Sequence, residues 1–181
     1  MNEQFLINQC KRHQRRAQKQ LFEELYVPSY RLARRYLVNS YDAEEALGNA
    51  FIRVFNNIAQ FEYRGEGSLL KWVNTIVINE CIRFLSKYKL VLVEEDVALL
   101  VAESVFDDFY SDYDSEEIQA IIDHMPPGYR TVFNLFAVEG YSHQQIAFML
   151  NISEGTSRSQ LGKARNYIID KLKHRTYYGT A

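Results

Sequence analysis

Apolar residues spaced three and four positions apart run through most of this 181-residue chain. Between Asp42 and Ile58 they follow the pattern i, i+3, i+4, i+7, which places them on one face of an α-helix. Only three prolines and eight glycines interrupt such patterns. The spacing therefore predicts an all-α protein built from amphipathic helices.

Turn signals divide the first half of the chain into helices. The spacing predicts a helix over residues 14–37, in which Pro28 indicates a kink or a restart. Asp42 is predicted to be the N-cap of the next helix, with Glu45 completing a capping box. A loop with two glycines follows at residues 61–68, and the spacing predicts a third helix after it, capped by Ser68.

Charge is segregated along the chain. Residues 93–123 hold 11 acidic and no basic side chains, whereas residues 1–35 hold eight basic and three acidic ones, and residues 124–181 hold seven and three. The net charge of −2 therefore averages two neutral-to-basic blocks with one acidic stretch. We expect two small helical domains, residues 1–92 and 115–181, joined by an acidic linker over residues 93–114.

Other features narrow the class of protein. The sequence has no apolar run of about 18 residues, so no membrane-spanning segment is expected, and its first residues lack the features of a secretory signal. Cys10 and Cys81 are far apart and have no metal-ligand spacing. We therefore expect a cytoplasmic protein with two free thiols, no metal and no cofactor.

The final third of the chain has the signals of a helix-turn-helix. Gly140 ends one predicted helix, and Ser142 with Gln145 forms a capping box for the next. Asn151 stands where a tight turn needs left-handed backbone geometry, and Ser153 caps a longer helix that runs to about Lys173. The predicted small core consists of Ile146, Ala147, Leu150, Ile152 and Leu161.

The second helix of such a motif enters the major groove of DNA by its first turns. Arg158 and Gln160 are the candidates for reading base edges, because Arg suits guanine and Gln suits adenine. A small helical bundle with a solvated polar face is the alternative. The complete set predicted to face DNA is Thr156, Arg158, Ser159, Gln160, Lys163 and Arg165.

The segment EGYSHQQIAFMLNISEGTSRSQLGKARNYI resembles region four of bacterial sigma-70-type factors, especially the extracytoplasmic-function (ECF) group. This resemblance implies binding to a minus-thirty-five promoter element. The sequence departs from the family pattern at four positions, where Gln145, Asn151, Ser157 and Gln160 replace Glu, Gly, an apolar residue and a basic residue.

The segment YDAEEALGNAFIRVFNNIAQF resembles region two of the same group, in the helix that docks on RNA polymerase. The resemblance implies that Asp42, Glu45, Asn49 and Arg53 bind polymerase. Gly48 stands where the family has Gln, and because glycine destabilises a helix interior we predict a close approach of another group there.

The segment FEYRGEGSLLKWVNTIVINECIRFLSKYK resembles the part of region two that opens the promoter. Strand opening needs a pocket for an unstacked base, apolar walls and nearby cations. Trp72 has the spacing of a core residue, which we favour over a base-stacking role. The set predicted to contact the minus-ten element is Tyr63, Arg64, Lys71, Asn74, Thr75, Asn79 and Arg83.

Together the resemblances imply an ECF-type sigma factor that binds core RNA polymerase and promoter DNA and is not an enzyme. They also leave an anti-sigma factor open as a partner. The alternatives are a helix-turn-helix regulator that does not join polymerase, and an enzyme that uses the acids of residues 94–117, which lack a ligand spacing. The linker has two open roles, passage through basic polymerase channels or simple solubility.

Overall fold

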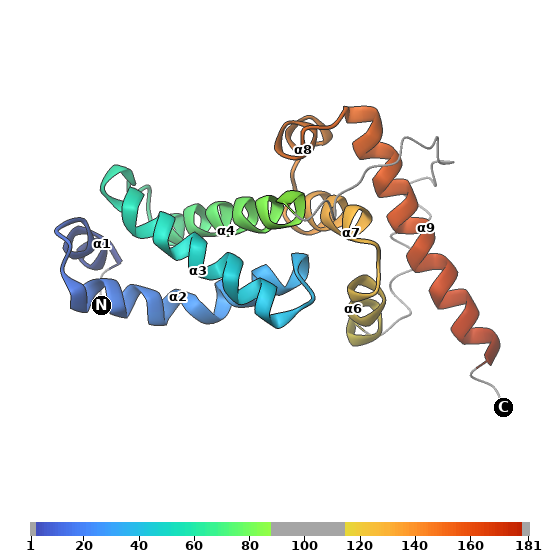
Figure 1. Cartoon of the computed structure of the whole chain (residues 1–181), viewed down its shortest axis with the longest axis horizontal. Helices are drawn as coiled ribbons and strands as arrows, with labels where there is room; N and C mark the ends of the chain where they lie inside the picture. The colour runs from blue at the N-terminus through green and yellow to red at the C-terminus, as the bar shows by residue number, and fades with distance from the viewer. Residues whose placement is uncertain (1–2, 88–114, 179–181) are drawn as a thin grey trace. The chain divides into compact units, whose positions relative to one another are not determined.

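The computed structural model describes residues 3–87 and 115–178, and the regular elements in these ranges are all helices. The prediction of an all-α protein is therefore confirmed. The chain divides into two compact units, Met1–Lys87 and Tyr88–Ala181 (Figure 1). The predicted linker over residues 93–114 lies outside the described residues.

The N-terminal unit is a bundle in which α2, α3 and α4 pack against one another and α1 packs on α2 (Figure 1). Its core is apolar, with Leu21, Tyr36, Leu47 and Leu85 almost fully buried. The helices are α1 (Glu3–Lys11), α2 (Arg15–Tyr36), α3 (Ser40–Asn57), the short 3-10 helix η1 (Ile58–Gln60) and α4 (Ser68–Lys87).

The first two helices differ from expectation. Helix α1, which buries Leu6, Ile7 and Cys10, was not predicted from the sequence. Of the two outcomes predicted at Pro28, a kink or a restart, the restart is wrong, because α2 continues through this residue. Pro28 is exposed, and buried side chains on both sides of it anchor the helix against the core, which offsets the lost hydrogen bond.

The predicted cap of α3 is also wrong. The helix starts at Ser40, and the side chain of Asn39 accepts hydrogen bonds from the backbone N–H groups of Tyr41 and Asp42. Asp42 lies in the first turn instead, where its charge favours the positive end of the helix dipole. No other part of the described structure approaches Gly48 closely, because a Cβ atom there would meet nothing within 4 Å.

The C-terminal unit packs shorter helices around one long helix. Its elements are α6 (Ser115–Asp123), α7 (Pro127–Phe133), the π-helix η2 (Asn134–Val138), α8 (His143–Leu150) and α9 (Glu154–Tyr178). Helix α9 contacts α6, α7 and α8. The predicted helix over residues 129–139 is thus an α-helical segment followed by a π-helical one.

The turn chemistry of this unit follows the sequence. The capping box of Ser142 and Gln145 forms, Gly140 has a φ of 75°, and Asn151 has a φ of 55° in the left-handed region. Ser153 accepts the backbone N–H of Thr156 at 2.9 Å and so caps α9. The helix-turn-helix geometry is therefore confirmed.

Candidate nucleic-acid interface

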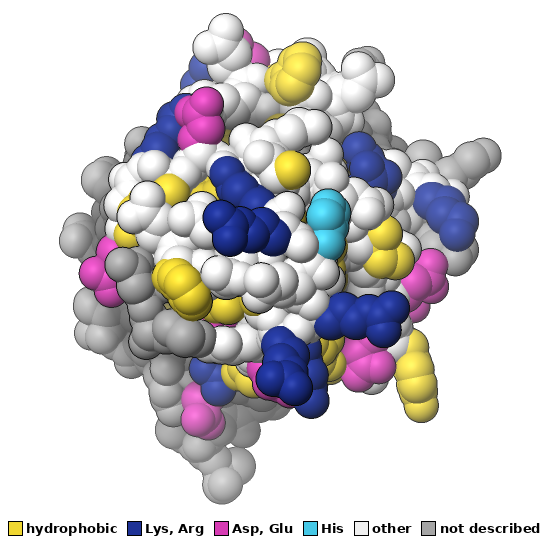
Figure 2. Space-filling model, turned by 90° about the vertical axis from the view of Figure 1, so that its left-hand side faces the viewer, with side chains coloured by type: hydrophobic (Ala, Val, Ile, Leu, Met, Phe, Trp, Pro, Cys, Tyr) yellow, Lys and Arg dark blue, Asp and Glu magenta, His cyan; other side chains and the backbone are white. Residues whose placement is uncertain are grey.

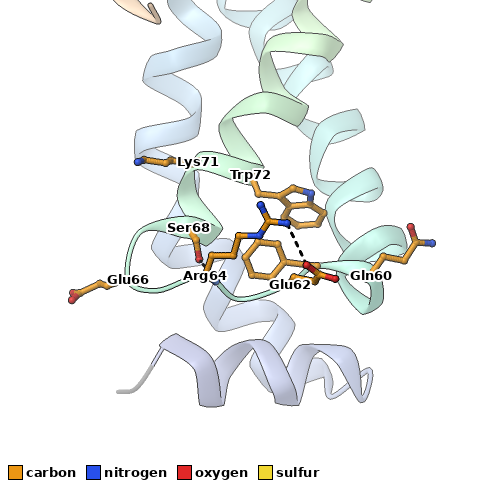
Figure 3. A pocket seen from close by; sticks show the side chains of 8 residues that line it. Gln60, Glu62, Arg64, Glu66, Ser68, Lys71 and Trp72 are labelled. Carbon is orange, nitrogen blue, oxygen red and sulfur yellow. Dashed lines mark hydrogen bonds and ion pairs between the residues drawn. The ribbon is translucent and has the colours of Figure 1, made fainter.

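Two adjoining hollows lie beside the exposed face of α4, and Gln60 and Trp72 line both. The larger hollow has a volume of about 690 Å³ and lies against the loop that joins η1 to α4 (Figure 3). Figure 3 shows Glu62, Arg64 and Trp72 gathered at this hollow, whereas Glu66 points away from it. The remaining residues that line it are Phe61, Ser68 and Lys71.

Short hydrogen bonds hold the loop beside the larger hollow. The hydroxyl of Ser68 donates to the carbonyl of Gly65 at 2.6 Å and accepts the backbone N–H of Arg64 at 3.2 Å. Ser68 was predicted to cap α4, but its hydroxyl instead closes this turn. Gly65 and Gly67 have φ values of 105° and 78°, which residues with a side chain rarely adopt.

Helix α1 braces the same loop. The ammonium of Lys11 donates to the carbonyl of Phe61 at 2.6 Å. Partial burial, followed by the carboxylates of Glu3 and Glu66, raises the pKa of the Tyr63 phenol above its ordinary value. The phenol therefore stays protonated at neutral pH and remains a hydrogen-bond donor.

Trp72 occupies a half-buried position between core and surface. Its ring lies 5.0 Å from the ring of Phe61, with 40° between the ring planes. Because the indole lines both hollows, the predicted core role describes only part of its environment. An aromatic side chain in this position can both support the loop and offer an edge to an unstacked base.

The smaller hollow, of about 390 Å³, contains a cluster of charges. Glu80 of α4 pairs with Arg53 of α3 through Nε, and with Arg83 one turn along α4 at 3.0 Å. The Glu80 side chain is only 8% exposed, whereas those of Arg53 and Arg83 are 49% and 57% exposed. Asn79 lines the same hollow, and the remaining lining residues are Asn57, Gln60, Trp72 and Ile76.

The fold brings together most of the set predicted for the minus-ten element. Arg64 and Lys71 line the larger hollow, and Asn79 and Arg83 line the smaller one. Thr75 is exposed one turn from Lys71, to whose carbonyl its hydroxyl donates. Asn74 is half-buried, and its side-chain oxygen is buried with no hydrogen-bond partner in the described part of the chain.

Several residues of the hollows were not predicted from the sequence, among them Gln60 and Glu80. Nothing in the sequence distinguishes Gln60 from other exposed polar residues, so it could not be predicted. Glu80 did carry one, since its position falls on the side of α4 that also holds the buried residues Val73 and Val77. A carboxylate at an apolar helix position indicates a charged partner nearby.

The residues predicted to dock on polymerase lie on α3. Glu45 and Asn49 are exposed one turn apart, and Asp42 is partly exposed at the start of the helix. Ile52 is 60% exposed beside them. Arg53 instead lines the smaller hollow with the α4 residues.

Basic residues also gather at the α1–α2 end of this unit. Figure 2 looks onto that end, where Lys and Arg side chains stand near the middle of the face and also toward its edge, and Asp and Glu lie mostly toward the edge. The sequence around the α1–α2 turn supplies Lys11, Arg12, Arg15, Arg16 and Lys19. Such a face attracts phosphates at long range.

In the C-terminal unit the first turns of α9 divide into exposed and buried side chains. Arg158 is exposed and pairs with Glu154 at 3.2 Å. Lys163 lies over the ring of Tyr129, 5.9 Å from its centroid. Thr156, Ser159 and Arg165 are partly exposed.

Gln160 contradicts its predicted role. Its side chain is only 2% exposed, and its Oε1 atom is buried with no hydrogen-bond partner in the described residues. A base-reading side chain must reach the groove, so the prediction that Gln160 reads a base edge is wrong for this fold. Its neighbour Ser157 is also buried, and the Ser157 hydroxyl lies 2.9 Å from Nδ1 of His143.

Three further features of the described residues concern metal sites, thiol reactivity and membrane-spanning helices. No group of three His, Cys, Asp or Glu side chains there could hold a metal ion. Cys10 and Cys81 are free and buried, and burial raises their pKa to about 11 and about 12. Within the same ranges no helix is long and apolar enough to cross a membrane.

Comparison with known proteins gives matches to both halves of the chain. The family model of sigma-70 region 2 matches residues 21–90, and the model of sigma-70 region 4 matches residues 115–168. The chain is 30% identical over 156 residues to the ECF RNA polymerase sigma factor SigW of Bacillus subtilis. That alignment covers 80% of this chain and 82% of SigW.

Two further matches extend the comparison. The chain is 29% identical over 151 residues to the ECF RNA polymerase sigma factor SigE of Mycolicibacterium smegmatis, which covers 80% of this chain but only 58% of that longer protein. The fold is similar to that of the sigma factor RpoE from Bartonella quintana, solved in complex with the anti-sigma factor NepR. That similarity has a TM-score of 0.52 at 20% identity and covers 86% of this chain and 96% of RpoE. The chain belongs to the ECF group of sigma-70-type RNA polymerase sigma factors.

Proposed function

We propose that this protein binds core RNA polymerase, directs it to promoters and helps to open the DNA there. The main support for the proposal is that one chain of this family holds two candidate interfaces, one in each unit. The N-terminal unit has a polar ridge and two hollows beside α4, and the C-terminal unit has a helix-turn-helix. Binding energy alone does this work, so we assign no covalent chemistry to the protein.

The proposed organisation follows the sequence. Residues 1–92 act on polymerase and the minus-ten element, residues 115–181 act on the minus-thirty-five element, and residues 93–114 join them. The exposed ridge of Asp42, Glu45 and Asn49, with the apolar Ile52 beside it, is the proposed docking surface for polymerase. Since polymerase and the chromosome share the bacterial cytoplasm, the protein works there.

For the melted strand we propose the surface that joins the two hollows. Cations on either side of an aromatic ring suit a single strand, because phosphates pair with the cations while an unstacked base meets the ring. Arg64 and Lys71 supply the cations of the larger hollow, and Trp72 supplies the ring. Asn79 offers both a donor and an acceptor to a base edge.

For the duplex we propose α9. Arg158 is the base-reading side chain, because it is exposed and its planar guanidinium can bond a guanine with two N–H groups. Thr156, Ser159, Lys163 and Arg165 surround it as phosphate contacts. Arg158 must leave its surface pair with Glu154 to do so, which costs little since exposed ion pairs are weak.

Reconstitution with core polymerase tests the proposal. We expect the purified protein to form a complex with core enzyme and to support initiation from promoters found by footprinting on genomic DNA. Glu45→Ala combined with Asn49→Ala should weaken complex formation. Glu44→Ala, at an exposed site about 100° around the same helix from Glu45, is the control and should leave complex formation unchanged. Failure to bind core enzyme at all would favour the regulator that acts without polymerase.

The role of Asn79 is tested separately. Asn79→Ala should impair strand opening, measured by permanganate reactivity of unpaired thymines, more than it impairs formation of the polymerase complex. Asn79 is exposed, so its removal leaves the core intact. Equal losses in both assays would contradict the assigned role.

A further inference from the structure

Glu80 is a buried carboxylate on a surface proposed to bind DNA. It belongs to α4, and it pairs with one arginine from α3 and one from its own helix. An acid beside a phosphate-binding surface repels the ligand unless its charge is fully engaged. The structure meets this condition, because the carboxylate is covered while roughly half of each arginine side chain stays exposed.

The ion pairs with Glu80 restrict two flexible side chains, those of Arg53 and Arg83. A free arginine loses considerable rotamer entropy when it binds a ligand. Glu80 holds Arg53 and Arg83 at the wall of the smaller hollow before any ligand arrives, and Asn79 lies in the same wall. Each guanidinium has five N–H donors, so a pairing with Glu80 leaves others for a second acceptor.

We propose that Glu80 is a positioning residue, and that it aligns Arg53 and Arg83 to contact the phosphates of the melted DNA strand around the nucleotide at Asn79. This inference rests on the proposed function and adds a role for Glu80. It also assigns Arg53, which the docking motif placed at polymerase, to the DNA-facing surface.

Removal of the Glu80 charge distinguishes this inference from a simple electrostatic effect, because the two predict opposite changes in DNA affinity. Glu80→Gln removes a negative charge beside DNA, which by charge alone strengthens binding. If Glu80 positions the arginines, the same change weakens binding about fivefold, because both side chains must then be ordered by the DNA. Glu66→Gln is the matched control, an exposed acid at the larger hollow whose removal should leave affinity unchanged or raise it.

The experiment uses holoenzyme reconstituted from core polymerase and each full-length variant. The probe is fluorescein-labelled single-stranded DNA of randomised sequence, because phosphate contacts do not depend on sequence. Affinity is measured against salt concentration. Arg53→Gln with Arg83→Gln should lower the slope of log K against log salt by about 1.4, since each phosphate that is no longer neutralised lowers it by about 0.7. In that double-arginine background, Glu80→Gln should weaken binding no further.

Three results would overturn the inference. Glu80→Gln could leave binding unchanged or strengthen it, the double-arginine variant could keep the wild-type slope, or the loss of binding from Glu80→Gln could persist without the arginines. Removing both arginines leaves the buried Glu80 carboxylate without these two partners, so folding of each variant is checked by circular dichroism. The variant that carries all three changes has no buried charge at this site, and it tests the salt slope if a less substituted variant fails to fold. Promoter-dependent initiation by the wild type is measured in parallel, and its absence would refute the proposed function instead.

Discussion

The helices proposed to face DNA differ in how they bury polar side chains, and on α4 the buried one is Glu80. Along α4 the polar residues Thr75, Asn79 and Arg83 all stay exposed. Along the first turns of α9, Ser157 and Gln160 are buried while Arg158 is exposed. Helix α4 has one broad side against α2 and α3, whereas α9 contacts α6, α7 and α8.

The difference shows when a sequence motif can predict which of its residues are exposed. A helix packed on one side keeps most of its polar stripe in solvent, so spacing separates core from surface for most residues of α4 but not for Glu80. A helix surrounded by shorter helices buries residues at most angles, including polar ones. The C-terminal unit also buries the polar residues Arg130, Thr131 and Asn134, which lie on α7 and η2.

Arg130 shows how such burial is made tolerable. Its guanidinium donates to the carbonyls of Asp123 and Met125, both at 3.0 Å, and so joins the end of α6 to the start of α7. Burial lowers the pKa of Arg130, and the nearby Asp123 opposes that shift. The charge is thus held by backbone carbonyls where an apolar residue would normally pack.

The largest expected effect tests whether the units are independent. Leu47→Ala in the N-terminal core should destabilise that unit by about 2–5 kcal/mol, because the truncation leaves a cavity. Leu172→Ala should do the same to the C-terminal unit. Urea unfolding followed by hydrogen exchange of each unit measures both. A loss of protection in both units from either variant would contradict two separately folding domains.

A smaller effect tests the exposed side of α9. Arg158→Ala should cost about 1–3 kcal/mol of binding free energy at a cognate minus-thirty-five element and much less at a scrambled one. Lys163→Ala is the control, since removal of a phosphate contact weakens binding to both sequences alike. Holoenzyme binding to the two DNAs measures the difference. A uniform loss from Arg158→Ala would reassign that side chain to phosphate.

A substitution on the buried side of α9 should change the stability of the C-terminal unit and leave DNA affinity unchanged. Gln160→Leu should stabilise the C-terminal unit by about 1 kcal/mol, because it removes a buried oxygen that has no hydrogen-bond partner among the described residues. DNA affinity should not change. Gln144→Leu, the same change at an exposed site of α8, should leave stability nearly unaltered. Chemical denaturation measures stability, and a drop in DNA affinity with Gln160→Leu would restore its role as a base reader.

The smallest effect concerns the thiols of the N-terminal unit. Because burial raises the pKa values of Cys10 and Cys81 to about 11 and about 12, both stay protonated in the folded state at mildly alkaline pH. Iodoacetamide should modify them only after unfolding. Their contribution to stability is complete below the unfolded pKa of about 8.5 and is lost as pH rises toward the folded values. Rapid modification of the folded protein would contradict this burial.

Much of the fold could be predicted from local signals. The helix-turn-helix followed from the Ser142 capping box, Asn151 and Ser153, because caps and left-handed turns depend on a few adjacent residues. The unbroken α2 could not be predicted in this way, since the anchors that hold it past Pro28 come from packing against other helices. Helix α1 was not predicted either, because its apolar face is short and the helix is stabilised by packing on α2.

By itself the sequence determined the helical class, the turns of the C-terminal unit and the membership of its two motifs in one family. Helical periodicity and capping are local, so they can be read without knowing what surrounds them. Only the tertiary structure decided that Glu80 joins Arg53 to Arg83 and that Gln160 lies inside. Both outcomes depend on which other helices lie around a given side chain, and residues far apart in the chain set that arrangement.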